Sequence, residues 1–346
     1  MTHERVLAIF PGALGDFICF LPALERLAER SVIDVLARTE FSDLAPLNVQ
    51  VGSLERFEIR SLFVSGGSQH EKVRGFFESY AATYSWLGSR QAIFEQELSS
   101  VTHQRARLFP FRSVRMRMHQ AEYYLSCLNE WPTISAPRVR PKPKAVEWTQ
   151  AYWEQNSIGC KPVLAIAPGS GAREKNWPVN SFDAVARWWR DWVGGAVLIL
   201  LGPVEEERGG YSTLCRSSLV MRGVNLGLLA ALLARCSLYI GNDSGTSHLA
   251  AAVGTPTVAV FGPSDLAQWA PRGESVSILT QNVQCSPCTD STMKSCAHRK
   301  CLTHFEPAEV IQKLAELPAV SKLTKRGVGI TVFSEISPES CGRTAG

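Results

Sequence analysis

The sequence predicts an α/β protein of two Rossmann-like, doubly wound parallel-sheet domains that face a cleft. The chain has 346 residues, 45% of them hydrophobic, which is longer than a single-domain protein usually is and is typical of two globular domains. Short apolar runs alternate with helical periodicity, and a pattern of strand, glycine-containing turn and helix occurs twice. We therefore expect an N-terminal domain over 1–150, a C-terminal domain over 151–320 and a disordered polar tail over 321–346.

The first unit opens with a βαβ pattern. The apolar run 5–10 has the length of a buried parallel strand, and a glycine-containing turn follows it. Apolar residues at helical spacing over 17–28 predict a helix, and the run 32–37 predicts the second strand. Residues 76–98 look helical, whereas the rest of 60–145 carries mixed signals.

A connector rich in Pro and Lys, residues 136–148, precedes the second unit. There, strands and helices alternate again, with Asn180 or Ser181 as the expected N-cap of the first helix. The expected strands start at 162, 196, 238 and 257, and the expected helices cover about 181–192, 226–236, 244–253 and 307–317.

Polar clusters follow three of these strands: "GALGD" at 12–16, "PGSGAREKNWP" at 168–178 and "GNDSGTSHL" at 241–249. In a doubly wound sheet, ligands bind beyond the carboxyl ends of the strands, where loops lead into helices. The three clusters are therefore predicted to line one site.

The cluster at 241–249 is typical of an anion-binding helix start. Asp243 and Ser244 can cap a helix whose first free N–H groups point outward, and Gly245 lets an oxygen approach the backbone. A diphosphate fits there, although a capped helix without a ligand is the alternative. Arg173 and Lys175 on the second glycine-rich loop favour a phosphorylated ligand.

Two carboxylates have both a chemical and a structural interpretation. Glu205 follows a strand and can accept hydrogen bonds from ribose hydroxyls, or be a solvated carboxylate at a helix start. Asp16 enters the first helix at the cleft edge. It can act as a general base, or simply be stabilised by the helix dipole.

The net charge of +4 is too small to indicate nucleic-acid binding. The segment between residues 99 and 121 is nevertheless basic, with five arginines and no acidic residue. It can attract phosphates or an anionic bilayer, or be a solvated face. The five are Arg105, Arg107, Arg112, Arg115 and Arg117.

Four clustered cysteines have the spacing C-x2-C-x7-C-x4-C: Cys285, Cys288, Cys296 and Cys301. Thiolates at such spacing can bind zinc or an iron–sulfur cluster, but no second C-x2-C pair follows. We predict no metal cofactor at these cysteines, and a structural metal is the weaker alternative.

The motifs "GALGDFICFLPAL", "PGSGAREKNWP" and "GNDSGTSHLAAAVGTPTVAVFGPSDLAQWAP", followed by "CSPC…CAHRKCL", resemble glycosyltransferase family 9, the lipopolysaccharide heptosyltransferase family. The resemblance spans about residues 5–315, without a matching motif in 50–145. It implies a GT-B fold with the acceptor in the N-terminal domain and the donor nucleotide in the C-terminal one.

The resemblance also implies roles for single residues. Asp16 would be the general base and Lys175 the contact to the donor diphosphate, and Glu205 would bind the ribose. The remaining donor-binding residues would be Gly15, Gly169, Ser170, Arg173, Asp243, Ser244, Gly245, Thr246 and His248. The five arginines are the candidate acceptor-binding residues.

The implied function is metal-independent, inverting transfer of a heptose or related hexose. The donor would be a nucleoside-diphosphate sugar such as ADP-heptose, and the acceptor a lipopolysaccharide core or other cell-surface glycan. No Asp-x-Asp motif occurs, and no cofactor is expected. The first residues lack a signal-peptide layout, so we expect a cytoplasmic protein that touches the inner membrane face. A non-catalytic nucleotide-sugar-binding scaffold and a nucleotide-sugar epimerase are the alternatives.

Overall fold

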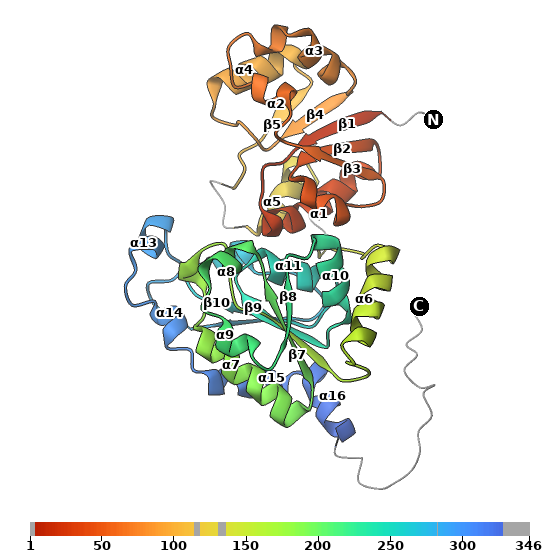
Figure 1. Ribbon diagram of the computed structural model, residues 1–346. Helices are drawn as coiled ribbons and strands as arrows, with labels where there is room; N and C mark the ends of the chain where they lie inside the picture. The colour runs from red at the N-terminus through yellow and green to blue at the C-terminus, as the bar shows by residue number, and fades with distance from the viewer. Residues whose placement is uncertain (1–3, 114–117, 131–135, 282, 328–346) are drawn as a thin grey trace.

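The computed structural model describes residues 4–113, 118–130, 136–281 and 283–327, which form two stacked units (Figure 1). The N-terminal unit contains a five-stranded parallel sheet in the order β3-β2-β1-β4-β5. Its strands are β1 (Arg5–Ile9), β2 (Val32–Ala37), β3 (Val49–Ser53), β4 (Ala82–Ser85) and β5 (Ala106–Leu108). Its helices are α1 (Leu14–Ala28), η1 (Thr39–Asp43), α2 (Phe57–Ser61), η2 (Gly67–Gln69), α3 (Glu71–Glu78), α4 (Ala92–Val101) and α5 (Gln120–Cys127).

The C-terminal unit contains a six-stranded parallel sheet in the order β11-β10-β9-β6-β7-β8. Three of its central strands are buried along their whole length, as expected where helices cover both faces. The strands are β6 (Val163–Ala167), β7 (Ala196–Leu201), β8 (Leu219–Arg222), β9 (Leu238–Asn242), β10 (Thr257–Phe261) and β11 (Val276–Thr280).

Eleven α-helices, a 3-10 helix and a π-helix accompany this sheet within the described ranges. They are α6 (Pro143–Gln155), η3 (Arg173–Lys175), α7 (Val179–Trp188), the π-helix η4 (Trp189–Val193), α8 (Pro203–Arg208), α9 (Ser212–Cys215), α10 (Leu226–Arg235), α11 (Gly245–Ala252), α12 (Leu266–Trp269), α13 (Asp290–Ser295), α14 (Lys300–Thr303), α15 (Pro307–Glu316) and α16 (Pro318–Gly327). No helix in the described ranges has the length and apolar character needed to cross a bilayer.

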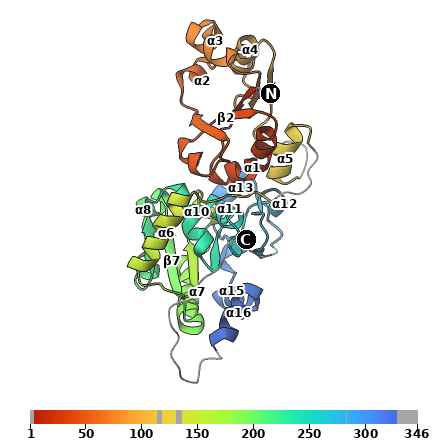
Figure 2. The ribbon, with the colours of Figure 1, turned by 90° about the vertical axis from the view of Figure 1, so that its right-hand side faces the viewer.

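The two units meet at α1 and α11, as the two views show (Figures 1 and 2). One cluster of buried apolar side chains crosses this boundary, because Phe17 and Phe20 of α1 share it with Leu249 and Ala250 of α11. Burial of apolar area on both helices holds the units together. The polar ends of their strands therefore face a common space.

Several expected elements differ from the structure. Residues 76–98 are not one helix, since β4 separates the end of α3 from α4. The expected caps Asn180 and Ser181 lie inside α7, whose N-cap is Pro178. The predicted domain boundary at residue 150 falls within α6, which packs against α10.

The predicted tail over 321–346 begins as a helix. Residues 318–327 form α16, so the first part of the tail is ordered. The remaining residues, 328–346, lie outside the described part of the chain.

Candidate active site

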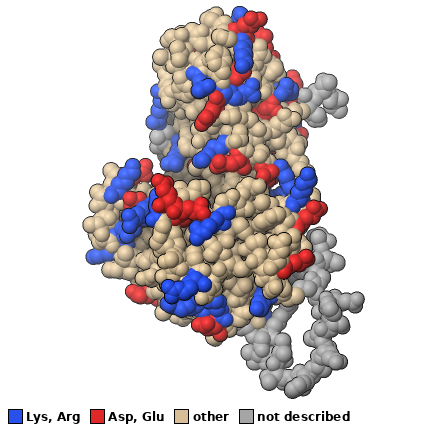
Figure 3. Space-filling view, viewed as in Figure 1, with Lys and Arg blue, Asp and Glu red and all other residues tan. Residues whose placement is uncertain are grey.

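A cavity of about 810 Å³ lies between the two units. Its walls come from the start of α1, from the loops after β6, β7 and β9, and from α12 and α13. Charged side chains of both signs mark the boundary between the units on the face drawn in Figure 3. Of the predicted site residues, these line the cavity: Gly15, Asp16, Arg112, Gly169, Ser170, Lys175, Glu205, Asp243, Ser244, Gly245, Thr246, His248 and Cys288.

Strand order explains why two of the sequence clusters converge. The C-terminal sheet reverses its winding between β6 and β9, which are neighbours in the sheet although β7 and β8 come between them in the chain. Loops leave such a pair in opposite directions and open a crevice at the carboxyl ends. The glycine-rich loop after β6 and the start of α11 form this crevice.

The N-termini of α1 and α11 approach each other at the cavity. A Cβ atom added to Gly245 would lie 2.7 Å from Leu14 Cβ and 2.9 Å from the Gly15 nitrogen. Only glycine permits this approach without displacing the backbone of α1. Because the N-terminus of each helix carries partial positive charge, the two dipoles together favour an anion in the cavity.

Asp16 lies in the first turn of α1 and is 8% exposed. The Ala13 N–H donates to its Oδ2 at 3.2 Å, whereas its buried Oδ1 has no partner among the described residues. Burial raises the pKa of the carboxyl, and Arg112, the Ala13 N–H and Lys175 act against that rise. A desolvated carboxylate with a spare acceptor oxygen is suited to take a proton.

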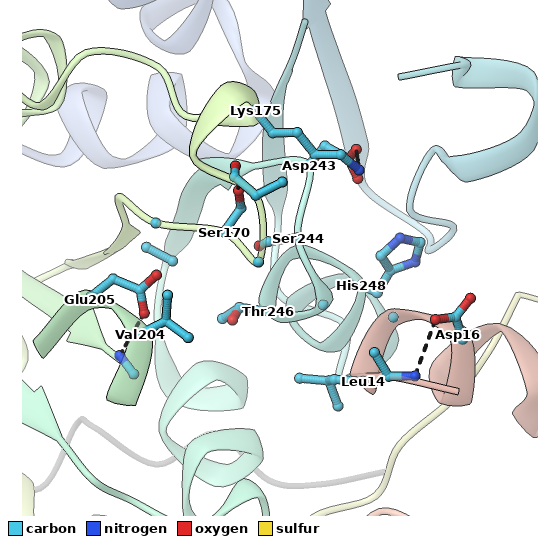
Figure 4. A pocket seen from close by; sticks show the side chains of 18 of the residues that line it. Leu14, Asp16, Ser170, Lys175, Val204, Glu205, Asp243, Ser244, Thr246 and His248 are labelled. Atoms are coloured by element: carbon cyan, nitrogen blue, oxygen red, sulfur yellow. Dashed lines mark hydrogen bonds and ion pairs between the residues drawn. The ribbon is translucent and has the colours of Figure 1, made fainter. Parts of the chain in front are cut away.

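Lys175 and Asp243 form an ion pair in the wall of the cavity. Lys175 Nζ donates to Asp243 Oδ2 at 2.7 Å, and the Ser264 hydroxyl donates to the same oxygen at 2.5 Å (Figure 4). The Asp243 side chain is 7% exposed, so the ammonium compensates a buried negative charge. Lys175 thus lies beside α11 with its charge held in place.

The expected capping of α11 is only partly present. Ser244 is the N-cap residue of this helix, but its side chain makes no capping hydrogen bond, and Asp243 is engaged by Lys175 and Ser264 instead. The Ser244 hydroxyl and the Asp243 carboxylate therefore accept no hydrogen bond from the first backbone amides of α11. Those amides stay available to an anion.

Glu205 lies at the other end of the cavity from Asp16, with Ser244 and Thr246 between them in the view of Figure 4. Its Oε2 accepts from the Gly202 N–H at 3.0 Å, which fixes the start of α8. A Cβ atom at Gly169 would lie 1.9 Å from Glu205 Oε1. Because Gly169 has no side chain, the Glu205 carboxylate has room to lie at the cavity wall.

His248 lies one turn into α11, where it is buried against α1. Its Nδ1 lies 3.7 Å from Cys19 Sγ. Burial lowers the pKa of His248 to about 4, with the Asp243 carboxylate acting in the opposite direction. The imidazole is therefore neutral near pH 7, and it adds no positive charge to the cavity.

Ser170 and Arg173 lie in the predicted loop but differ in orientation. The Ser170 hydroxyl lies 2.7 Å from the Ala172 carbonyl and 2.6 Å from Asn176 Oδ1, so it braces its own loop. Arg173 is exposed and is not among the cavity-lining residues that the structure describes. Lys175, two positions later, is the cation of this loop that reaches the cavity.

The arginine cluster divides. Arg112 lines the cavity and lies 4.9 Å from the ring centre of Trp269 on the opposite unit. Arg105 Nε donates to the Thr102 carbonyl, Arg107 lies over the Tyr84 ring, and neither lines the cavity. Arg115 and Arg117 lie outside the described residues.

The clustered cysteines lie around α13 and α14. Cys288 borders the cavity, and Cys301 is buried beneath β10 with Leu302. In the described part of the chain, no three His, Cys, Asp or Glu side chains are grouped as ligands for a metal ion. All four thiols are free.

Some cavity residues escaped sequence reasoning. Trp269, within the motif "GPSDLAQWAP", lines the cavity, and its place in the loop region after β10 was the available sequence signal. Arg38 and Glu40, which follow β2 and pair at 3.2 Å, also line the cavity. Their position at a strand end of the N-terminal sheet was the available clue.

Two doubly wound units that share one cavity have the architecture of the GT-B fold of glycosyltransferases. The comparisons agree with this class. The model of glycosyltransferase family 9 (heptosyltransferase) matches residues 59–298, and the chain belongs to this family.

Single relatives are more distant. The chain is 29% identical to lipooligosaccharide heptosyltransferase 2 of Campylobacter jejuni over 166 residues, which cover 45% of this chain and 51% of that protein. The alignment thus spans about half the length of the first curated relatives that it matches. Lipopolysaccharide heptosyltransferase 2 of Escherichia coli K12 aligns over 302 residues at 24% identity, covering 75% of this chain and 83% of the relative.

A solved structure shows the same fold. It is the glycosyltransferase family 9 protein of Veillonella parvula, with a TM-score of 0.73 and 20% identity. The superposition covers 94% of this chain and 98% of that one.

Proposed function

We propose that this chain is an inverting glycosyltransferase that moves a heptose or related hexose from a nucleoside-diphosphate sugar to a cell-surface glycan without a metal ion. Membership of family 9 supports the reaction class. The named relatives, heptosyltransferases of lipopolysaccharide and lipooligosaccharide, support a heptose as the transferred sugar and an acceptor of the lipopolysaccharide class. We propose an ADP-heptose-like donor and the lipopolysaccharide core as the acceptor. Such an acceptor would bring the protein to the inner face of the cytoplasmic membrane.

The observation that carries the proposal is the pairing of two sites across one cavity. Asp16 offers a buried carboxylate with an unpartnered oxygen, and the start of α11 offers free amides beside Lys175. The donor diphosphate would bind at α11, with the ribose toward Glu205 and the sugar toward Asp16. The acceptor would enter from the side of Arg112 and Trp269.

The reaction follows from this arrangement. Asp16 takes the proton of the acceptor hydroxyl, and the acceptor oxygen forms a bond to the anomeric carbon of the donor sugar. The bond from that carbon to the diphosphate oxygen breaks, and the leaving group keeps the electron pair. Lys175 and the amides of Gly245 and Thr246 stabilise the growing negative charge, an effect that can reach several kcal/mol.

Ligand-induced stabilisation tests the donor site. We would measure the melting temperature with ADP, GDP, UDP, CDP and dTDP, because a ligand at about one hundred times its Kd adds roughly 2.7 kcal/mol of stability. One diphosphate should stabilise the protein selectively. Lys175→Ala should remove the effect, and Arg173→Ala, on the same loop but outside the cavity, should keep it.

The result separates the possible functions. Stabilisation together with sugar transfer to a lipopolysaccharide acceptor supports the proposed reaction. Stabilisation without transfer indicates a binding protein, and conversion of the donor without any acceptor indicates an epimerase. No stabilisation by any diphosphate, in the presence or absence of acceptor, would refute the donor site.

A further inference from the structure

Four buried side-chain polar atoms lack a hydrogen-bond partner among the described residues: Asp16 Oδ1, Trp86 Nε1, Gln120 Oε1 and the Tyr124 hydroxyl. All belong to the N-terminal unit, and three of them lie on α1 and α5, which pack against each other. Buried polar atoms are nearly always satisfied, so such a concentration beside one carboxylate calls for an explanation.

The Tyr124 side chain is 0% exposed and enclosed by aromatic rings. Its ring centre lies 5.2 Å from that of Phe10 and 5.6 Å from that of Phe20, both in edge-to-face contact. These rings offer the phenol no conventional acceptor. Its partner must therefore be a polar group of the same pocket.

Gln120, one turn earlier on α5, is the first such group. Its Nε2 donates to the Phe111 carbonyl at 3.2 Å, which leaves Oε1 as the spare atom. This amide lies beside the Tyr124 phenol without a well-formed hydrogen bond. The pocket thus holds one spare hydroxyl donor, on Tyr124, and two spare acceptors, on Gln120 and Asp16.

Asp16 is the second polar group that acts on the phenol. Burial and then the Asp16 carboxylate raise the pKa of Tyr124 well above its ordinary value, so the phenol keeps its proton and can donate. Titratable and charged groups face Asp16 from each packed element: Cys19 on α1, Tyr124 on α5, Arg112 before α5, Lys175 on η3 and His248 on α11. Among them, Tyr124 is fully buried and lies on α5, which packs against α1.

We propose that Tyr124 is a positioning residue for Asp16. The Tyr124 hydroxyl supplies, through one water that Gln120 Oε1 also holds, the hydrogen bond that Asp16 Oδ1 lacks among the described residues. With Oδ2 held by the Ala13 N–H, both carboxylate oxygens are then fixed. Such a bond favours the charged carboxylate and offsets its burial. Its role in catalysis rests on the proposed function, but the bond itself does not.

The test is a titration of Asp16 that needs no substrate. Carbon-13 in the aspartate carboxyls would be followed by NMR against pH, with Asp16→Asn identifying the signal. Tyr124→Phe should raise the pKa of Asp16 by about one unit, since a donor to the charged form is lost. Tyr123→Phe is the matched control, because that hydroxyl donates to the Pro110 carbonyl at 2.6 Å and should leave the titration unchanged.

A second variant guards against loss of folding. Gln120→Met keeps the phenol and should shift the pKa of Asp16 in the same direction, by less. An unchanged Asp16 titration in Tyr124→Phe, or in Gln120→Met if the former does not fold, overturns the proposal. A shift in a protein that transfers no sugar would keep the hydrogen bond and refute the function instead. In an active protein, Tyr124→Phe should also move the acid limb of the kcat/KM profile to higher pH.

Discussion

At the scale of single residues, Asp16 combines a chemical advantage with a cost in stability. Its carboxyl is buried at the wall of the cavity, and burial raises its pKa. A carboxyl with a raised folded-state pKa contributes most to stability at low pH, and that contribution is lost as the pH rises through the folded pKa. Near neutral pH the charged, desolvated form therefore lowers the free energy of unfolding.

We expect Asp16→Asn to reduce sugar transfer by about 10²–10⁴-fold, the usual contribution of a general base. The same change should raise the melting temperature at pH 8, because it removes a desolvated charge. The gain should shrink as the pH falls and wild-type Asp16 becomes protonated. Paired rate and melting measurements from pH 4 to 8 check both effects, and normal transfer by the variant would exclude Asp16 as the base.

Single residues also show what the sequence could and could not predict. Motif position placed Lys175 and Asp243 at strand ends, and both line the cavity. The two residues lie 68 positions apart in the chain, and their ion pair forms because β6 and β9 are neighbouring strands. No local sequence pattern encodes that strand pairing. For the same reason the sequence could not predict that Arg173 is exposed. The 3-10 helix η3 determines which of Arg173 and Lys175 faces the cavity.

At the scale of elements, the contact between α1 and α11 depends on glycine. We expect Gly245→Ala to cost about 1–3 kcal/mol of unfolding free energy, because its methyl group would press on Leu14 and the Gly15 backbone. It should also weaken diphosphate binding by displacing the first amides of α11. Denaturant unfolding and ligand-induced melting shifts measure the two effects.

The matched control is Gly75→Ala in the interior of α3, where an added Cβ meets nothing within 4 Å. There the change should stabilise by about 0.5–1 kcal/mol, because alanine loses less entropy in a helix. Equal effects of the two substitutions would contradict a special contact at Gly245.

Elements with strong patterns were predictable from the sequence, and weak ones were not. The run 32–37 is β2 with the expected bounds, since five of its six residues are apolar, as is typical of a parallel strand. By contrast, β4 has only four residues and lies between two helices. Its alternating burial is too short a pattern to distinguish it from the helix predicted over 76–98. Short strands of this kind are set by pairing with β1, which is a tertiary contact.

At the scale of the whole molecule, three contacts join the segment around α5 to the loop around α12. His119 Nε2 lies 2.8 Å from the Ala270 carbonyl, Arg272 pairs with Glu122 at 2.6 Å, and Arg112 lies over Trp269. The sequence predicted two units from a repeated strand–turn–helix pattern. Because these contacts join distant segments, it could not predict how the units are fastened.

We expect acid to weaken this joint. Burial lowers the pKa of His119 to about 4, below the value of about 6.5 for an unfolded histidine. The associated stability is present above pH 6.5 and is lost as the pH falls toward 4. His119→Asn should therefore show a melting temperature that depends less on pH over this range than the wild type does. Parallel curves for the two proteins would refute the effect.

Because the two units meet at α1 and α11, the proposed reaction depends on how the units are positioned relative to each other. Under the proposed function, the N-terminal unit holds Asp16 as the proton acceptor and the C-terminal unit holds the diphosphate site, so neither half contains a complete reaction centre. A rotation of one unit about this contact changes the distance between Asp16 and Lys175 before it disturbs either sheet. Turnover thus reports the mutual alignment of the halves, and a pair of fluorophores, one on each unit, would follow the same coordinate.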